Sequence, residues 1–221
     1  INGRNTEAGN KVVEQIKAMG RRSIFEKADL YNFSEVKQMA DNVIEKLGKI
    51  DILVATGAAA SAKGLPRFFR EIDPEDYGVF ATSRWFSRAY AIRAVLDHMI
   101  EREYGKIVMV TTDAGRIPTP GESMNGAAAA AVMLMTRALA NEFTRWKIRV
   151  NCLSITITET ETYQVGLNGP LGKIFQKAAD RIPFGIDKPE DIAEAALFFA
   201  SAESDQITGA TLSINGGLSF P

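Results

Sequence analysis

The sequence has little cysteine, little histidine and almost no net charge. Its one cysteine, Cys152, excludes an intrachain disulfide, and the apolar stretch IRVNCLSI around it favours a buried core thiol. No apolar run is long enough to span a membrane, and no signal peptide is visible. The formal net charge is -1, so nothing favours nucleic acid or a membrane surface as a partner. We therefore expect a cytoplasmic protein.

Segments typical of helices and of strands alternate along the chain. Strands are predicted over 22–30, 50–58, 106–112, 147–155 and 207–215, and helices over 5–19, 34–47, 73–103, 124–143 and 189–200. This alternation implies an α/β fold, a Rossmann-like doubly wound parallel sheet covered by helices on both faces. No linker or repeat interrupts it, so residues 1–221 are predicted to form a single domain.

The sequence lacks the turn that holds a dinucleotide in such a sheet. A doubly wound sheet normally opens with a strand, a Gly-rich turn and a helix that bind the pyrophosphate, yet no G-x-G-x-x-G occurs here. The opening INGRN is typical of a strand end that leads into a helix. The absent unit belongs in the middle of the sheet, and an open slot there leaves backbone groups unpaired. We expect either that about 30 upstream residues are missing or that the unit is lost.

Several stretches of the chain follow one another in the order of a known family. They are KADL, DILVATGAA, GKIVMVTTDAG, AVMLMTRALANE, RVNCLS, PFGIDKPEDIAEAALFFAS and ITGATLSINGG. On these stretches the chain resembles the short-chain dehydrogenases/reductases, close to the 3-oxoacyl-carrier-protein reductases, from Arg4 to Pro221. The resemblance implies hydride transfer between a nicotinamide and a carbonyl or alcohol carbon. It also implies that Arg4, Asp29 and the stretch Ala55-Thr56-Gly57-Ala58 are remnants of a cofactor site.

The residues at the four catalytic positions of that family are all changed. The resemblance places Thr112 at the serine position, Asn125 at the tyrosine position, Ala129 at the lysine position and Arg84 at that of a structural asparagine. In the family the tyrosine transfers the proton, because a lysine cation pulls its pKa down from about 10. The Asn125 amide has no accessible proton-transfer equilibrium, and Ala129 has no charge. Loss of the acid/base group costs on the order of 10²–10⁴ in rate.

Other residues are candidates to replace the lost groups. His98 lies within a predicted helix, where we expect a helix-surface or interface imidazole. Tyr163 lies where the family has a mobile substrate lid, and a packing role is expected there. Glu122 precedes a helix and is expected to be a solvated loop carboxylate, with an inward-pointing acid as the alternative. Arg84 is expected to fill the space of the missing lysine, with a bound anion as the alternative.

A preserved frame around an altered site predicts a catalytically silent subunit. The resemblance implies a main subunit interface through the helices 74–103 and 124–143, and the small residues 126–131 permit close packing. We hypothesise a non-catalytic subunit of a hetero-oligomeric, NAD-dependent alcohol dehydrogenase, a heterotetramer with a homologous active subunit. The partner then binds the NAD and oxidises a secondary alcohol of an acyl-CoA thioester to a ketone. We expect no cofactor and no metal in this chain.

Two alternatives remain open. The first is a homo-oligomeric protein that uses the old pocket to bind a ligand or to regulate. The second is an oxidoreductase with relocated catalytic groups, in which Thr112 acts with Tyr163 or Glu122.

Overall fold

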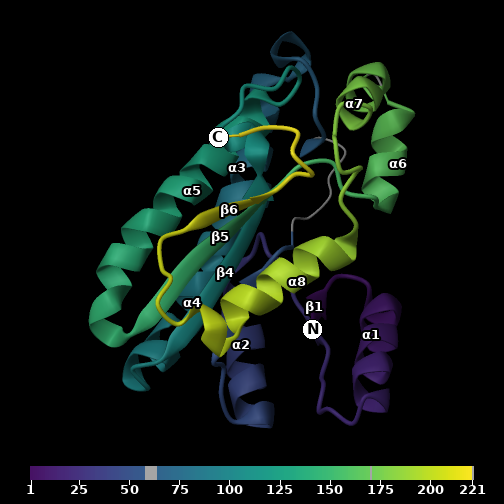
Figure 1. The fold of residues 1–221 in the computed structure, drawn as a ribbon. Coiled ribbons are helices and arrows are strands. Elements are labelled where there is room, and N and C mark those ends of the chain that lie inside the picture. Colours follow the sequence, from purple (N-terminus) through teal and green to yellow (C-terminus); the bar gives the residue numbers. More distant parts are fainter. Residues whose placement is uncertain (58–63, 170, 221) are drawn as a thin grey trace.

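The fold contains two parallel sheets with helices packed around them (Figure 1). The computed structural model describes residues 1–57, 64–169 and 171–220. The smaller sheet pairs β1 (Asn2–Gly3) with β2 (Glu26–Lys27). The larger has the order β3 (Ile52–Ala55), β4 (Gly105–Thr112), β5 (Ile148–Ile155) and β6 (Thr211–Ile214), all parallel. The predicted Rossmann-like α/β fold is confirmed.

Helices cover both faces of the larger sheet. The helices of the structure are α1 (Thr6–Ala18), α2 (Phe33–Leu47), α3 (Tyr77–Ala81), α4 (Ser87–Glu101), α5 (Ser123–Phe143), α6 (Glu161–Leu167), α7 (Gly172–Ala179) and α8 (Pro189–Ala200). Helices α4 and α5 pack on one face, with α2 against α4, while α8 crosses the other face (Figure 1). Helices α6 and α7 pack against each other beyond the carboxyl ends of the strands (Figure 1).

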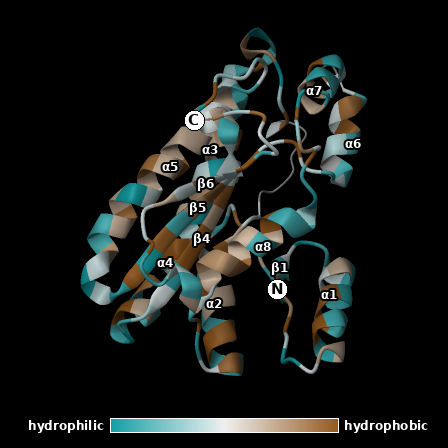
Figure 2. Cartoon of the chain, in the orientation of Figure 1, coloured by the Kyte–Doolittle hydropathy of each residue, from teal (hydrophilic) through white to brown (hydrophobic). Residues whose placement is uncertain are grey.

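The core is built on the two central strands. β4 is buried along all but its last residue, as expected for a parallel strand covered on both faces, and Figure 2 shows the apolar colour of this strand. Cys152 of β5 is fully buried, and burial raises the pKa of its thiol to about 12. The prediction of a buried core thiol is therefore confirmed. Among the described residues, no helix is both long and apolar enough to cross a membrane.

An open slot separates the two sheets. The edges of β1 and β3 line one cavity of about 470 Å³, together with residues of α2 and α4. Apolar side chains that line this slot are not covered by other residues, since Ile52 and Val54 are 41% and 43% exposed. The position agrees with the unpaired mid-sheet slot predicted from the sequence.

The helix predicted over 73–103 needs a correction. Asp73 does cap its start, because the carboxylate accepts a hydrogen bond from the Glu75 amide at 3.0 Å. The chain then makes a 3-10 turn (Pro74–Asp76), the short helix α3, a π-helical stretch (Thr82–Phe86) and only then α4. A π-helical turn holds one extra residue, and such turns are frequent at functional sites. Hydrophobic spacing did not distinguish this stretch from a regular α-helix.

Two further predictions were inaccurate in extent. The strand predicted over 22–30 is only β2, because its neighbour β1 offers just two residues for pairing. The strand predicted over 207–215 is β6, four residues long. The helices α6 and α7 were not predicted, since the segment after β5 has no long apolar repeat.

Candidate functional site at the carboxyl ends of the strands

Thr112 ends β4 and begins the turn that faces α5. Its side-chain oxygen accepts a hydrogen bond from the Ala114 amide at 3.3 Å, which caps the 3-10 turn Asp113–Gly115. The hydroxyl hydrogen remains available as a donor. Thr112 therefore retains hydrogen-bonding capacity but no proton-transfer group.

Asn125 and Ala129 lie one turn apart on α5 and are enclosed by protein. They are 2% and 0% exposed. The Asn125 side-chain oxygen is buried and has no hydrogen-bond partner among the described residues. The turn packs directly on this part of the helix, because a Cβ added at Gly115 would lie 2.9 Å from the Ala129 Cβ. The small residues thus allow the turn and the helix to meet, and they leave no ionisable group at either position.

Two arginines of the long helical segment approach the same edge of the sheet. Arg84 lies in the π-helical stretch, and its Nε is buried without a hydrogen-bond partner among the described residues. Arg88, one turn later, is only 3% exposed. Burial and then the charge of Arg84 lower the pKa of Arg88 to about 10, so the Arg88 side chain is still a cation at neutral pH.

Arg88 joins the ends of two neighbouring strands. Its guanidinium donates to the carbonyl oxygens of Gly57 at 2.9 Å, Val110 at 3.0 Å and Thr56 at 3.3 Å. The sequence reasoning missed this residue. Arg88 could have been found from its position, because it lies one helical turn after Arg84, among residues expected to face the sheet.

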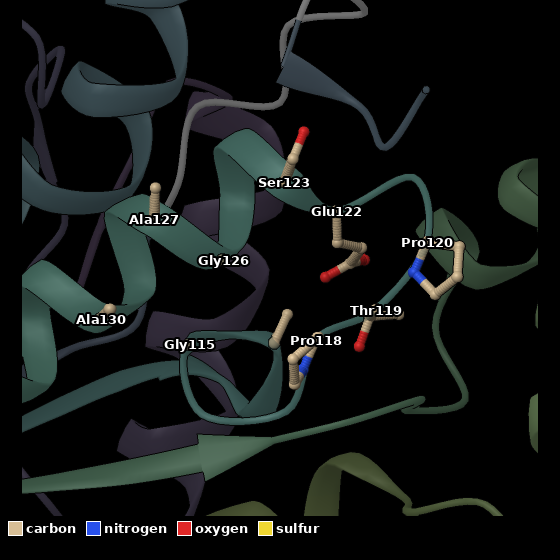
Figure 3. Close-up of a pocket in the computed structure, with 10 residues that line it drawn as sticks. Gly115, Pro118, Thr119, Pro120, Glu122, Ser123, Gly126, Ala127 and Ala130 are labelled. Atoms are coloured by element: carbon tan, nitrogen blue, oxygen red, sulfur yellow. The ribbon is translucent and has the colours of Figure 1, made fainter. Parts of the chain in front are cut away.

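Glu122 lies at a cavity between α5 and the preceding loop. The cavity is about 500 Å³ in volume and is lined mainly by small or apolar residues, namely Ala114, Gly115, Pro118, Thr119, Pro120, Ser123, Gly126, Ala127 and Ala130. Figure 3 shows the carboxyl group of Glu122 directed into it. Burial raises the pKa of Glu122, and the positive charge of Arg84 partly offsets this. The expected solvated carboxylate is corrected to an inward-pointing one, because the loop folds back over the helix start.

Asp113 is the centre of a buried polar network that was not predicted. Its carboxylate is 5% exposed and accepts from Ser154 at 2.6 Å, Ser213 at 3.0 Å and Asn215 at 2.7 Å. Arg116 lies 3.2 Å away as its ion-pair partner. The network connects β4, β5, β6 and the C-terminal segment. Sequence alone offers no signal for it, since the partners lie up to about 100 positions apart.

Asp187 lies where the segment that contains α6 and α7 rejoins the rest of the fold. It pairs with Thr158 in an isolated parallel bridge, so the chain leaves and re-enters the body at one point. Asp187 is 5% exposed, and its Oδ2 has no hydrogen-bond partner among the described residues. Burial first, then the charges of Asp191 and Asp113, raise the pKa of Asp187 to about 6.

The residues predicted as remnants of a cofactor site lie at the ends of the first strands. Arg4 follows β1 and is exposed, and the Asp29 carboxylate accepts from the Tyr31 amide at 3.0 Å. Ala55 ends β3, and the carbonyl groups of Thr56 and Gly57 accept from Arg88, as described above. Ala58 lies outside the described residues.

The remaining candidates take separate places. His98 accepts a hydrogen bond from the Ile50 amide at its Nε2, at 3.2 Å, so it joins α4 to the start of β3. Tyr163 lies on α6, and no hydrogen bond joins its side chain to Thr112 or Glu122 in the described part of the chain. No group of three or more potential metal-ligating side chains occurs within that part either.

Comparison with known proteins assigns the chain to a family. Residues 1–219 match the family model described as enoyl-(acyl carrier protein) reductase. The 3-oxoacyl-[acyl-carrier-protein] reductase FabG of Chlamydia pneumoniae is 32% identical over 219 residues, which cover 99% of this chain and 85% of the relative. The chain belongs to the short-chain dehydrogenase/reductase family.

Other members of the short-chain dehydrogenase/reductase family are comparably similar. The (2S)-[(R)-hydroxy(phenyl)methyl]succinyl-CoA dehydrogenase subunit BbsD of Thauera aromatica is 31% identical over 221 residues, 100% of this chain and 86% of that one. A 7α-hydroxysteroid dehydrogenase, solved with NADH and 7-oxo glycochenodeoxycholic acid, has a TM-score of 0.89 at 27% identity, over 98% and 82% of the chains. A gluconate 5-dehydrogenase from Burkholderia cenocepacia, solved with NADP and tartrate, has a TM-score of 0.86 at 26% identity, over 99% and 84%.

Proposed function

We propose that this member of the family is a non-catalytic subunit of a hetero-oligomeric, NAD-dependent alcohol dehydrogenase. One observation carries the proposal: Asn125 and Ala129, at the positions predicted for the family's tyrosine and lysine, are enclosed and contribute an amide and a methyl group. Neither group can transfer a proton at neutral pH. The surrounding frame is intact, because β4, the turn after it and α5 pack closely.

The same residues argue against a nicotinamide cofactor in this chain. A bound nicotinamide would supply or accept a hydride, and the family resemblance assigns the binding of its ribose to a lysine. Ala129 offers neither charge nor hydrogen-bond donor there. Arg88 already engages the carbonyl groups at the ends of β3 and β4. We therefore place the NAD in the partner subunit.

The partner in this proposal is a homologous, active subunit in a heterotetramer. Helices α4 and α5 cover one face of the sheet. On the side of α5 that faces away from the sheet, Ala127, Ala130 and Leu134 are exposed to solvent. Small residues on that side permit close approach of a partner helix. The contact is proposed through the segment 74–103 and α5.

The reaction of the partner is proposed as oxidation of a secondary alcohol on an acyl-CoA thioester to a ketone. The Thauera aromatica relative supports this class, since its name describes a subunit of a dehydrogenase acting on a hydroxy(phenyl)methylsuccinyl-CoA. The present chain is proposed as the silent subunit of a dehydrogenase of that type. In it, Asp113 and Asp187 hold the C-terminal and α6–α7 segments in place.

Glu122 favours a second candidate, an oxidoreductase with relocated groups. The Glu122 carboxyl lies at a cavity and has a raised pKa, and both properties are typical of general acids in enzymes. In that case the isolated chain would turn over an alcohol with NAD, and Thr112→Ala would abolish the activity. No turnover by the isolated chain would remove this candidate.

Isolation of the native complex tests the main proposal. A tagged copy is purified from its own cells, and the mass and composition of the complex are measured. A stoichiometric, homologous dehydrogenase that carries all the NAD binding is the expected result. A homo-oligomer of this chain alone would contradict the proposal and would direct attention to a ligand of the old pocket.

A further inference from the structure

Arg84 has neither a hydrogen-bond partner nor an ion-pair partner in the part of the chain that the structure describes. It lies in the π-helical stretch Thr82–Phe86, a kind of turn that is frequent at functional sites. Its Nε is buried and makes no hydrogen bond to any described residue. A buried donor that has lost water without gaining an acceptor is costly. An acceptor for Arg84 is therefore missing from this place.

Arg88 brings a second positive charge close to Arg84. The charge of Arg84 lowers the pKa of Arg88, which places the two guanidinium groups within electrostatic range of each other. Arg88 donates to backbone carbonyl groups and to the Ser87 hydroxyl, all of them neutral. No carboxylate is among the described groups that act on Arg88. Two neighbouring like charges without a counter-charge favour the binding of an anion.

Glu122 offsets this positive charge only in part. The charge of Arg84 acts on the Glu122 carboxyl, yet no ion pair joins the two side chains within the described ranges. Burial raises the pKa of Glu122 by more than the charge of Arg84 lowers it, so ionisation of this carboxyl is disfavoured. Two arginines against one carboxyl leave a net positive charge, which suits a ligand with a single negative charge.

Asn125 offers open hydrogen-bonding groups beside this charge. It lies three residues after Glu122 on α5, and the π-helical stretch packs against this helix. The Asn125 side chain is 2% exposed, and neither its buried Oδ1 nor its amide nitrogen bonds to a described residue. The amide nitrogen carries two donors. Buried polar groups are rarely left unpaired, so the Asn125 amide and the Arg84 guanidinium both await a polar ligand.

We propose that Arg84 and Asn125 form a binding site for the carboxylate group of a small organic acid. The planar fork of the Arg84 guanidinium matches the two carboxylate oxygens and holds them by charge-assisted hydrogen bonds. The Asn125 amide donates to one of these oxygens from α5. A carboxylate suits the site better than a phosphate, because a dianion would be repelled by Glu122. The site does not depend on the proposed partner, since a homo-oligomer of this chain would carry it as well.

Titration of the purified full-length protein with acetate tests this site, and acetamide serves as the uncharged ligand of the same shape. The Nε–H signal of Arg84 is followed by ¹H–¹⁵N NMR and is assigned by its loss in Arg84→Lys. We expect the signal to move with acetate, with a Kd on the order of 1 mM, and to stay in place with acetamide. Phosphate at the same ionic strength should bind about 10-fold more weakly.

Calorimetry on two Arg84 variants measures the contribution of the guanidinium. Arg84→Gln should raise the Kd for acetate about 10-fold or more, and Arg84→Lys by about 3-fold or more, since lysine keeps the charge but lacks the planar fork. The control is Arg137→Gln, which removes an exposed arginine of α5 and should leave the Kd within about 2-fold. Far-UV circular dichroism verifies that each variant folds, and the NMR titration of the parent stands even where a variant does not.

The outcomes separate the site from its ligand class and from the proposed function. An Arg84 signal that ignores acetate, or an Arg84→Gln variant with the Kd of the parent, would overturn the site. Tighter binding of phosphate than of acetate at Arg84 would overturn the carboxylate assignment. Acetate bound at Arg84 of a homo-oligomer would uphold the site while contradicting the proposed function.

Discussion

The guanidinium of Arg88 donates to the carbonyl oxygen of Val110 at 3.0 Å, from α4 to the last buried residues of β4. The same group reaches Gly57 beyond β3, so one side chain satisfies backbone acceptors of two strands. No carboxylate is bonded to it in the described part of the chain. Arg88 is therefore a buried cation whose hydrogen bonds go to backbone carbonyl groups and to the Ser87 hydroxyl.

Replacement of Arg88 should destabilise the fold. Arg88→Ala leaves buried carbonyl groups without donors, and the free energy of unfolding should fall by about 2–4 kcal/mol. Urea denaturation measures this. Arg93→Ala, which removes an exposed pair with Asp97, should cost less than about 0.5 kcal/mol. Equal costs for the two variants would show that the Arg88 hydrogen bonds contribute little.

A lysine at position 129 should not fit without cost. Ala129 is fully buried beneath the turn at Gly115, so Ala129→Lys forces a charge into a packed site. The free energy of unfolding should decrease by about 3 kcal/mol or more. The control is Ala127→Lys, two residues away on the exposed side of α5, for which a change within about 0.5 kcal/mol is expected. If Ala129→Lys is as stable as its control, the site has room for the family's lysine.

Asp187 should make the chain less stable at neutral pH than at mildly acidic pH. Its pKa is about 6 in the folded state and 3.8 ordinarily, so the folded state binds the extra proton. Stability should therefore fall as pH rises from about 4 through 6. Asp187→Asn removes this ionisation and should stabilise the protein at pH 7.5 by on the order of 1–2 kcal/mol. Melting at pH 4 and 7.5 measures it, and an equal effect of Asp187→Asn at both pH values would contradict the ionisation.

Loss of the Asp113 carboxylate should release the C-terminal segment. Ser154 and Asn215 donate to it from two other parts of the chain. Asp113→Ala should cost about 2–4 kcal/mol and should raise amide exchange in residues 213–219 more than in β4. Hydrogen exchange with mass spectrometry locates the change. Uniform protection across both segments would mean that the network does not anchor the C-terminal segment.

The fold was predictable where burial is continuous, and the site was predictable only in part. KIVMVTT and IRVNCLSI read as strands because both faces of these strands are covered. Thr112, Asn125 and Ala129 were located by family spacing, which fixes positions but not surroundings. The direction of Glu122 depends on the loop 114–120 folding over the helix start. Arg88 and Asp113 act through partners far away in sequence, and no local pattern encodes those contacts.

The most direct measurement compares turnover of the two-subunit complex with and without the polar groups of this chain. Thr112→Ala and Asn125→Ala are introduced into this chain, and the tyrosine of the partner's own catalytic site is replaced by phenylalanine in a separate complex. We expect that kcat with the variants of this chain stays within about 2-fold, while the partner variant loses on the order of 10²–10⁴ in rate. A comparable loss from Thr112→Ala or Asn125→Ala would show that this chain performs chemistry itself.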